Sequence, residues 1–396
     1  MMEWSLARVV AHDIGVSMIR PTERISLADA VGRTLTASLA CSADLPAQAV
    51  SAMDGWAVAG EPPWLLGHAI LAGDPPDDER LSAGVARGIA TGGAVPTGTL
   101  GILRTESGTV SESSTGHTHL RRSATARLHE PRAGEHVRAA GEELSAGETF
   151  LVAGDILTAP RVALAAVTGH DTVEVAAAIT VDLLLLGSEI VRTGAARPGE
   201  VRDAFSPQFP AVFRALGLAD CTIGFVRDDL DDTIARVAAS DATVLVTTGG
   251  TARGPADNMR EAINATGAAL LIDGVSMRPG HPIMLAQRPD GRLLLCLPGN
   301  PLAAMLGLAT IGAALIDGML GRPLARLGWV PLAVDCANTG AHTRLVSYRQ
   351  SDDGATPTTH QGSAMLRGLA QSDGVAVIPS GGSRAGQTVR TLPLPW

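Results

Sequence analysis

One segment, residues 242–260, constrains the fold of this 396-residue chain more than any other. It reads ATVLVTTGGTARGPADNMR: a β-branched apolar run, then Gly249 and Gly250, then a helix-compatible stretch that begins at Asp257. A strand that leads through a glycine loop into a helix points free backbone N–H groups and the positive end of the helix dipole at one place. The segment therefore predicts an anion-binding loop at the carboxyl end of a strand.

A second loop of this kind occupies residues 295–301, LCLPGNP, and contains Pro298, Gly299 and Asn300. It follows another apolar run and precedes an apolar helix predicted over residues 302–320. Two such loops in one domain favour a phosphate-bearing ligand that lies across the carboxyl ends of a sheet.

Strands and helices alternate from residue 180 onward, which predicts an α/β domain with a doubly wound, mostly parallel sheet. We expect strands at 181–186, 222–226, 243–248 and 270–275, helices at 209–216, 228–239 and 257–265, and a hairpin made by 282–286 and 292–297. Residues 43–138 carry short apolar runs between Gly, Pro and Ser turns, which is typical of a β-rich domain. Helices are predicted at 4–14 and 26–37, and a small β unit follows Pro323. A chain of this length exceeds one core, so several domains are expected.

Composition excludes some functions. The net charge of −9 argues against binding to a nucleic-acid backbone, whereas local loops and single arginines can still hold a small anion. The sequence has no lysine, so every fixed cation is an arginine. The four cysteines at 41, 221, 296 and 336 are widely spaced, which favours small buried side chains over disulfides or a zinc site. The N-terminal stretch lacks a signal-peptide pattern, so we expect a soluble, cytoplasmic protein with no membrane or nucleic-acid partner.

Short motifs extend the pattern over nearly the whole chain. They are SAMDGWAV at 51–58, TGGAVPTG at 91–98, VR and GEE at 137–143, the glycines and Asp257 of the first loop, RPGHP at 278–282, LPGNP at 297–301 and HQGS at 360–363. In order and spacing they match SAMDGYA, TGAPVPEG, R-x-x-GED, GGVSVG-x-x-D, KPGKP, LPGNP and HQGS. The chain therefore resembles the molybdopterin molybdenumtransferase family, the molybdenum insertases that include the gephyrin E domain.

The resemblance implies four domains: a linking helical and β domain (1–42 and 139–178), an inserted β-rich domain (43–138), a central MogA-like α/β domain (179–323) and a C-terminal β-barrel (324–396). It also implies a homodimer whose site lies between one protomer's α/β domain and the partner's N-terminal half. The family reaction takes adenylylated molybdopterin and molybdate, cleaves the pyrophosphate bond with Mg²⁺, and releases AMP and molybdenum cofactor. Other proteins of molybdenum cofactor biosynthesis are expected partners.

The resemblance also assigns roles to residues. Asp54 and Asp257 match carboxylates that position a metal or the nucleophile, and Thr91 would donate its hydroxyl to an anion. Ser188 stands at a catalytic acid position, and Glu189 beside it could join Asp257 at the metal. The other expected substrate-binding residues are Gly249, Gly250, Gly254, Arg278, His281, Pro298, Gly299, Asn300, Arg349 and Ser363. Structural readings stay open. Asp54 suits a turn, Asp257 the first turn of a helix, Thr91 a strand end, and Arg349 and Ser363 a solvated surface. Glu189 suits structural contacts better than a metal, and the loop glycines and Asn300 suit turns.

Several positions depart from the family pattern. Ser188 replaces an acid, Arg278 and His281 replace lysines, Ala252 replaces a serine, and Phe205 replaces an asparagine. Arg253 and a protonated His281 could offset part of the lost charge, although histidine is mostly neutral at pH 7. Each lost charge-assisted contact is worth roughly 1.5–3 kcal/mol. The alternative hypothesis is therefore a weakened or inactive paralogue that binds a pterin nucleotide or an insertase partner as a scaffold.

Two other enzyme classes find little support. A nucleotide-dependent dehydrogenase would need GxGxxG after a strand and an acid about twenty residues further on. A serine hydrolase would need a GxSxG elbow, which the Gly187-Ser188-Glu189 run does not supply.

Overall fold

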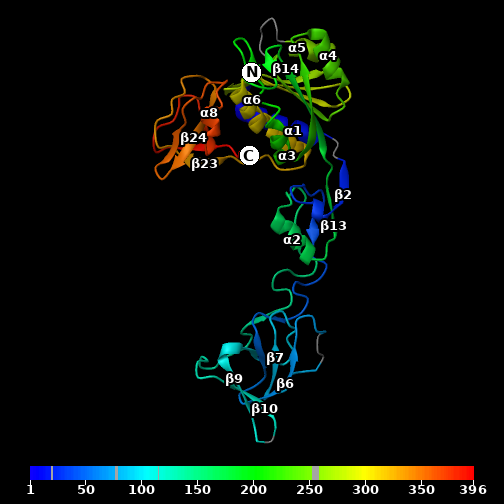
Figure 1. The fold of residues 1–396 in the computed structure, drawn as a ribbon, viewed down its shortest axis with the longest axis vertical. Helices are drawn as coiled ribbons and strands as arrows, with labels where there is room; N and C mark the ends of the chain where they lie inside the picture. Colours follow the sequence, from blue (N-terminus) through cyan, green and yellow to red (C-terminus); the bar gives the residue numbers. More distant parts are fainter. Residues whose placement is uncertain (19–20, 76–78, 115, 252–257) are drawn as a thin grey trace. The chain divides into compact units, whose positions relative to one another are not determined.

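The computed structural model describes residues 1–18, 21–75, 79–114, 116–251 and 258–396, apart from the side chain of residue 220. The chain divides into two compact units (Figure 1). Unit 1 consists of Met1–Ala37, Ala153–Ala159 and Thr172–Trp396, and unit 2 of Ser38–Val152 and Pro160–Asp171. The finer division into four domains stays a prediction.

A six-stranded sheet forms the centre of unit 1, in the order β17-β14-β18-β22-β21-β19. Its strands are β14 (Ile179–Leu186), β17 (Leu218–Val226), β18 (Val244–Thr248), β19 (Ala269–Asp273), β21 (Met284–Gln287) and β22 (Leu293–Leu297). The first four in this order are parallel, and β21 and β19 continue the sheet in antiparallel pairs. The expected mostly parallel sheet and the expected hairpin at 282–297 are both confirmed.

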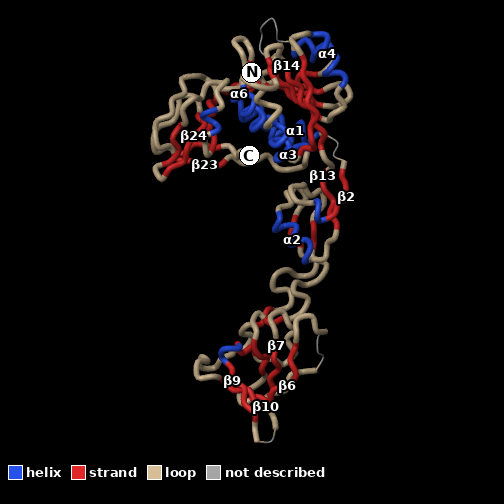
Figure 2. The backbone as a smooth tube through the Cα atoms, viewed as in Figure 1, coloured by secondary structure: helices blue, strands red, loops and turns tan. Residues whose placement is uncertain are grey.

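Helices cover both faces of this sheet (Figure 2). They are α3 (Phe209–Leu216), α4 (Leu230–Ala239), α5 (Met259–Ala265) and a continuous helix over 301–319 made of α6 (Pro301–Gly307), a π-helical segment (Leu308–Gly312) and α7 (Ala313–Met319). Successive side chains of β14 point to opposite faces. Leu183 and Leu185 join one hydrophobic cluster with α3, whereas Leu184 and Leu186 join another with α4 and α5. Helices therefore pack on both faces of the sheet, as the doubly wound fold predicted from the sequence requires.

The 301–319 helix packs against α1 (Trp4–Ser17) at a close glycine crossing. A Cβ built on Gly318 would lie 2.1 Å from the His12 carbonyl oxygen, and one built on Gly15 would lie 2.2 Å from the Leu315 carbonyl oxygen. By length and hydropathy the 301–319 helix could cross a membrane, but 83% of its most apolar window is buried within the fold. Such burial is typical of a core helix.

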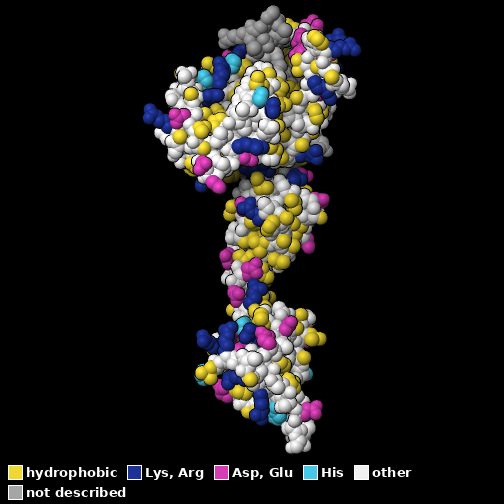
Figure 3. Space-filling model, turned by 60° about the vertical axis from the view of Figure 1, so that its left-hand side comes forward, with side chains coloured by type: hydrophobic (Ala, Val, Ile, Leu, Met, Phe, Trp, Pro, Cys, Tyr) yellow, Lys and Arg dark blue, Asp and Glu magenta, His cyan; other side chains and the backbone are white. Residues whose placement is uncertain are grey.

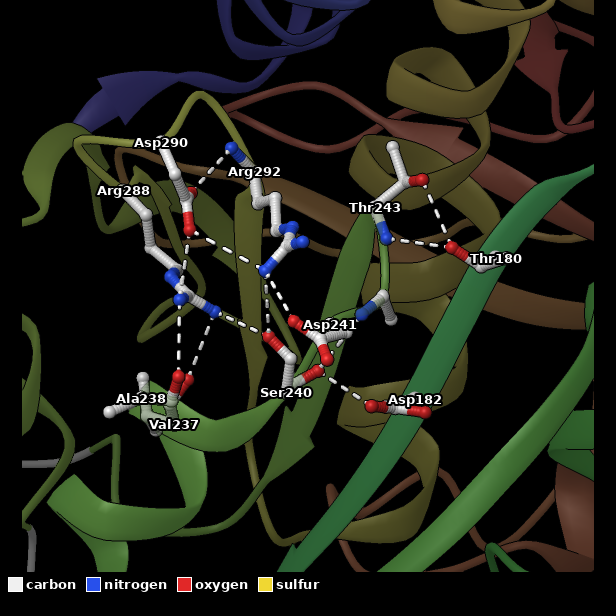
Figure 4. Close-up of polar contacts among 11 residues, drawn as sticks. Thr180, Asp182, Val237, Ala238, Ser240, Asp241, Thr243, Arg288, Asp290 and Arg292 are labelled. Carbon is white, nitrogen blue, oxygen red and sulfur yellow. Dashed lines mark hydrogen bonds and ion pairs between the residues drawn. The ribbon is translucent and has the colours of Figure 1, made fainter.

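Two arginines tie together the amino-terminal edge of the sheet (Figure 4). The Arg288 guanidinium donates to the carbonyls of Val237 (3.2 Å), Ala238 (3.2 Å) and Ser240 (2.7 Å), where α4 ends. Arg292 pairs with Asp241 at 2.9 Å. The last carbonyls of a helix lack intrahelical partners, so Arg288 satisfies groups that would otherwise be left unpaired. This network is structural and lies at the edge opposite the glycine loops.

A second sheet in unit 1 runs in the order β1-β20-β24-β26-β27-β23, and β25 pairs with β24. Its strands are β1 (Met2–Glu3), β20 (Val275–Arg278), β23 (Gly328–Pro331), β24 (Thr343–Ser351), β25 (Gly354–Pro357), β26 (Gly374–Ile378) and β27 (Thr388–Thr391). Because β20 pairs with both β1 and β24, the start of the chain, the α/β part and the C-terminal β unit share one hydrogen-bonded sheet. The short helix α8 (Arg367–Ala370) precedes β26.

Unit 2 is β-rich, as expected, and its sheet runs in the order β8-β5-β7-β6-β10-β9. These strands are β5 (Gly55–Val58), β6 (Trp64–Ile70), β7 (Val85–Ile89), β8 (Gly101–Arg104), β9 (Gly108–Glu112) and β10 (Thr118–Arg122). Two-stranded ladders join β3 (Leu39–Ala40) to β12 (Thr149–Leu151) and β4 (Val50–Ser51) to β11 (Val137–Arg138). The helix α2 (Ala159–Val167) begins at the boundary between the two units.

The helix predicted over residues 26–37 is wrong. This stretch contains one 3-10 turn, Leu27–Asp29, between β2 (Thr22–Ser26) and an isolated bridge from Leu35 to Val175. The strand β2 pairs with β13 (Thr172–Ala176), and Gly32 adopts a φ of +86°, which interrupts a helix. Pairing with a distant strand therefore outweighed the local helical pattern.

Candidate functional site

A pocket of about 860 Å³ lies in unit 1 at the carboxyl ends of the central strands. It brings together residues from both glycine loops, from the Arg278–Pro282 turn and from the C-terminal β unit. Its lining comprises Leu186, Glu189, Ile190, Val201, Arg202, Asp203, Ala204, Phe205, Asp228, Thr248, Gly249, Gly250, Thr251, Arg278, Pro279, Gly280, His281, Pro282, Pro298, Gly299, Asn300, Pro301, Ala303, Arg344, Leu345, Gln361, Ser363 and Ala364.

The two glycine loops touch because they follow neighbouring parallel strands, β18 and β22. The Gly249 N–H donates to the Leu297 carbonyl at 3.1 Å, and a Cβ on Gly299 would lie 3.4 Å from the Gly249 Cα. Gly249 itself has a φ of +91°, and a Cβ there would come within 2.5 Å of the Leu186 carbonyl oxygen. A side chain is therefore excluded at Gly249 by both conformation and space.

The 301–319 helix points its amino terminus into the pocket through Asn300 and Pro301. The Ala303 N–H at this end donates to the Ser363 carbonyl at 3.1 Å. The HQGS loop is thus held against the helix start, where its Ser363 lines the pocket. One of the donors at the helix start is consequently used inside the fold.

The cations of the pocket come from three separate segments: Arg202, Arg278 and Arg344. His281 stands among them, and its pKa is lowered by burial and by the charges of Arg278 and His342. His281 is therefore mostly neutral at pH 7. We expect it to replace little of the positive charge that a lysine would carry at this position. Sequence reasoning missed Arg202 and Arg344, because their strands, β16 (Val201–Arg202) and β24, lie outside the central sheet and only tertiary contacts bring them to this edge.

Arg349 lies outside the glycine-loop pocket. Its side chain is exposed, its Nε donates to the Gln371 carbonyl at 2.8 Å, and it does not line the pocket. Arg344, five residues earlier on β24, lines the pocket instead, and its guanidinium donates to the Ala337 carbonyl. The phosphate-binding role expected of Arg349 stays a prediction.

Among the described residues, three carboxylates line the pocket: Glu189, Asp203 and Asp228. Asp203 accepts hydrogen bonds from the backbone N–H groups of Phe205 (2.8 Å) and Ser206 (3.0 Å), so it mainly fixes a turn. Within the described ranges, no group of three or more His, Cys, Asp or Glu side chains is arranged to hold a metal. Glu189 and Asp228 are the carboxylates left for a ligand or a cation.

Ser188 does not line the pocket, but it holds Asp228, which does. Each backbone N–H of this pair donates to the other residue's side-chain oxygen at 3.0 Å. The sequence pattern predicted a helix from Asp228 onward; α4 instead begins at Leu230, with Asp229 as its N-cap. Asp228 is therefore free of helix capping, and its place directly after a parallel strand is the signal that could have identified it.

One buried hydroxyl is unpaired in the pocket wall. Thr248 ends β18, is 1% exposed, and its Oγ1 has no hydrogen-bond partner among the described residues. Buried polar atoms normally have a partner. An oxygen-rich ligand in the pocket would supply one.

In unit 2, Asp54 and Thr91 form a pair. The Thr91 N–H (2.7 Å) and hydroxyl (3.0 Å) both donate to the Asp54 Oδ1, and these hydrogen bonds lower the pKa of Asp54. Asp54 is therefore ionised at neutral pH. The Thr91 hydroxyl donates a hydrogen bond to the Asp54 carboxylate, so the predicted donation to an anion would require this hydrogen bond to break.

Two of the expected site residues, Gly254 and Asp257, lie outside the described residues, as do Ala252 and Arg253. Their assigned roles stay predictions.

Three family models match the chain in sequence order. They are the MoeA N-terminal region (domain I and II) over residues 4–169, a probable molybdopterin binding domain over 182–317, and the MoeA C-terminal region (domain IV) over 330–394. Among curated proteins, the molybdopterin molybdenumtransferase of Synechococcus elongatus is 28% identical over 378 residues, which cover 91% of each chain. That of Bacillus subtilis is 26% identical over 394 residues, covering 94% of this chain and 89% of the relative.

A solved structure of the molybdopterin biosynthesis MoeA protein from Pyrococcus horikoshii shares the fold. Its TM-score is 0.79 at 21% identity, and the match covers 99% of this chain and 100% of that one. The matched segments account for the β-rich N-terminal half, the α/β domain with the glycine loops, and the C-terminal β unit. The chain belongs to the MoeA family of molybdopterin molybdenumtransferases.

Proposed function

We propose that this protein inserts molybdate into adenylylated molybdopterin and releases AMP. The observation that carries the proposal is the pocket itself, which two touching glycine loops and three arginines line at the carboxyl ends of the parallel strands. Backbone N–H groups and guanidinium forks suit a ligand with several phosphate or oxyanion groups. The curated relatives, which are named for this transfer, support the same ligand class.

Within the proposed reaction, the chain's own groups bind and orient. The arginines oppose the charge of the phosphates and of molybdate, and so lower the cost of bringing anions together. The backbone at Gly249 and Gly299 lets a phosphate approach closely, since neither residue carries a side chain. Asp228, held by Ser188, is placed to orient a water molecule or a cation at the pyrophosphate.

We also propose that Mg²⁺ is required. Mg²⁺ is bound in proteins by one or two carboxylates together with waters and substrate phosphates. Glu189 and Asp228 supply two such carboxylates in the pocket wall, and the sequence predicts Asp257 as a third. The cation would neutralise charge on the phosphates. The site is therefore expected to assemble with substrate rather than in the protein alone.

The remaining parts of the proposal rest on the resemblance. They are the homodimer, the four-domain division, the cytoplasmic location, and the contribution of Asp54 and Thr91 to catalysis. The Asp54–Thr91 pair supports the last point, because its hydrogen bonds lower the pKa of Asp54 and so favour the carboxylate form that can hold a cation.

The direct test is AMP release by the purified full chain with adenylylated molybdopterin, molybdate and Mg²⁺. We expect multiple turnovers that depend on all three, and strongly reduced release from the Asp257→Ala variant. Wild-type release no greater than that of Asp257→Ala would refute the transferase proposal.

A second candidate function is a scaffold that binds the pterin nucleotide without turning it over. The observations that favour it are Ser188 in place of an acid and the lowered pKa of His281 in place of a lysine. Calorimetry would then show binding of the nucleotide without AMP release, or a pull-down would recover an insertase partner. Clear multiple turnover would exclude this candidate.

A further inference from the structure

The HQGS loop connects two walls of the glycine-loop pocket. Its residues Gln361 and Ser363 line the pocket, together with Arg344 from β24 and Ala303 from the first turn of α6. The Ser363 carbonyl accepts from the Ala303 N–H at 3.1 Å, which fixes one end of the loop to the helix. The other end is fixed to β24 by the side chain of Gln361.

The Gln361 amide takes the place of a neighbouring strand. The strand β25 pairs with β24 as far as Pro357, opposite Tyr348, and then ends. The next residue of β24 in this direction, Ser347, is 1% exposed, so its backbone groups need partners within the fold. The Gln361 Oε1 accepts from the Ser347 N–H at 2.9 Å, and the Gln361 Nε2 donates to the Ser347 carbonyl at 2.8 Å. The side-chain amide thus makes the two hydrogen bonds that a paired strand residue would make.

The donors of Gln361 are fully used in this arrangement. Besides the Ser347 carbonyl, the Nε2 also donates to the Thr358 carbonyl at 2.8 Å. A glutamine amide has two N–H donors, so Gln361 has none left for a ligand, although it lines the pocket. Its side chain is therefore suited to holding the loop rather than to binding an anion.

The residue before Gln361 has an unusual backbone conformation. His360 adopts a φ of +58°, in the left-handed region that favours glycine. The loop is also closely packed on its other side, because a Cβ on Gly368 would lie 2.5 Å from the Thr359 carbonyl oxygen. Such conformations persist where surrounding contacts hold them, and they are frequent at functional sites. The hydrogen bonds of Gln361 are contacts of this kind.

We propose that Gln361 is a positioning residue of the glycine-loop pocket. Its amide holds the HQGS loop against β24, so that Ser363 is presented to an anionic ligand in a fixed place relative to Arg344 on the same strand. Gln361 itself does not contact the ligand through a donor. This inference rests on the proposed function, because it takes the anion-binding pocket as given.

Calorimetric titration of sulfate into the purified full chain tests this role without the transferase reaction. Gln361→Met keeps the length of the side chain and removes all three hydrogen bonds. We expect it to weaken sulfate binding about threefold to tenfold, as the loss of one well-placed polar contact would. Gln350→Met is the matched control, because Gln350 is exposed on the same strand and its amide donates to the Ser351 carbonyl at 3.0 Å, away from the loop. It should bind sulfate as the wild type does.

A second control separates positioning from stability. Val389 is 5% exposed in the hydrophobic cluster of the C-terminal β unit and does not line the glycine-loop pocket. Val389→Ala should lower the thermal unfolding midpoint but leave the sulfate affinity unchanged when it is measured well below that midpoint. Equal weakening of sulfate binding by Val389→Ala and Gln361→Met would reduce Gln361 to a structural role and overturn the proposal.

A double-variant cycle shows whether Gln361 acts through Ser363. In the Ser363→Ala background, Gln361→Met should weaken sulfate binding by less than about twofold, because the side chain that it positions is already absent. The full loss in that background, or wild-type affinity in Gln361→Met alone, would refute the positioning role. An absence of sulfate binding in the wild type would instead contradict the anion-binding pocket, and with it both the proposed function and this inference.

Discussion

Ser188 and Asp228 exchange two hydrogen bonds of 3.0 Å, each backbone N–H donating to the other residue's side chain. They follow β14 and β17, which are adjacent parallel strands, so the pair ties two loops together at the carboxyl edge of the sheet. The bond from Ser188 occupies only the Oδ2 of Asp228, and the Oδ1 has no hydrogen bond among the described residues. A serine at position 188 thus supplies no charge itself but holds a carboxylate that does.

Asp228→Asn should remove this charge with little structural change, because the amide keeps an oxygen for the Ser188 N–H. We expect AMP release to fall about 10- to 100-fold, the effect of losing one charge-assisted contact of roughly 1.5–3 kcal/mol. Rates at saturating Mg²⁺ and the thermal unfolding midpoint should both be measured. Asp231→Asn, in the exposed first turn of α4, is the control. A fully active Asp228→Asn variant with a normal Mg²⁺ requirement would contradict the role given to Asp228.

His281 should make oxyanion binding depend on pH. Because its pKa lies below the ordinary value near 6.5, His281 is neutral at pH 7.5 and gains charge only as the pH falls below 6.5. We expect the affinity for sulfate, a dianion throughout this range, to rise about threefold to tenfold between pH 7.5 and 5.5, as a new but partly screened charge-assisted contact would give.

Calorimetric titration of sulfate at several pH values tests this expectation. His281→Gln should flatten the pH dependence at low affinity, and His281→Lys should flatten it at higher affinity. The same slope in wild type and His281→Gln would show that another group titrates.

Unit 2 contains a buried ion pair that should control its acid stability. Glu130 is 2% exposed and accepts from the Arg104 Nε (3.0 Å), the Ser107 hydroxyl (2.9 Å) and the Arg127 N–H (3.0 Å). Burial alone would raise the pKa of Glu130, but these hydrogen bonds outweigh it and bring the pKa to about 2. The pair therefore stabilises the fold fully above the ordinary carboxyl pKa, and this stabilisation is lost as the pH falls from about 4.5 towards 2.

Glu130→Gln should lower the free energy of unfolding by about 1–3 kcal/mol, because it removes a buried charge-assisted hydrogen bond while Arg104 keeps its exposed partner Glu106. Urea unfolding of the full chain at pH 7 measures this change. Glu106 also pairs with Arg104, at 2.9 Å, but its side chain is 62% exposed, so Glu106→Gln should cost less than about 1 kcal/mol. Equal effects of the two variants would contradict the importance of burial.

The crossing of α1 and α7 should not tolerate a side chain. Gly318→Ala places a Cβ 2.1 Å from the His12 carbonyl oxygen, so the helices must separate, at a cost of about 1–3 kcal/mol or more. Thermal unfolding should show a lower midpoint. Gly67→Ala is the control, since its Cβ meets nothing nearer than 3.5 Å. An unchanged midpoint in Gly318→Ala would mean that the helices are not packed this closely.

The composition fixes which side chains carry a permanent positive charge on the surface. Since the chain has no lysine, every dark blue side chain in Figure 3 is an arginine. Guanidinium groups keep their charge at any accessible pH, so the pH dependence expected above is assigned to histidine and carboxyl groups.

The sequence by itself determined the α/β domain and the place of its ligand loops. Apolar runs that end in glycine, followed by helical periodicity, are local signals, and the observed β18 and β22 with their loops follow them closely. Parallel strands end at one edge, so the meeting of Gly249 and Gly299 also follows from the chain pattern.

Only the tertiary structure decided which charged side chains enter the pocket. Arg202, Asp228 and Arg344 come from segments whose local sequence fits a strand edge, a helix cap or a surface strand. The strand pairing of residues 22–26 with 172–176 likewise overrode a helical pattern in the stretch that follows. A local sequence pattern shows which face of one helix or strand is apolar. Strand pairing and the entry of a charged side chain into the pocket depend instead on contacts between residues far apart in the chain, and a short stretch of sequence does not contain the energies of those contacts.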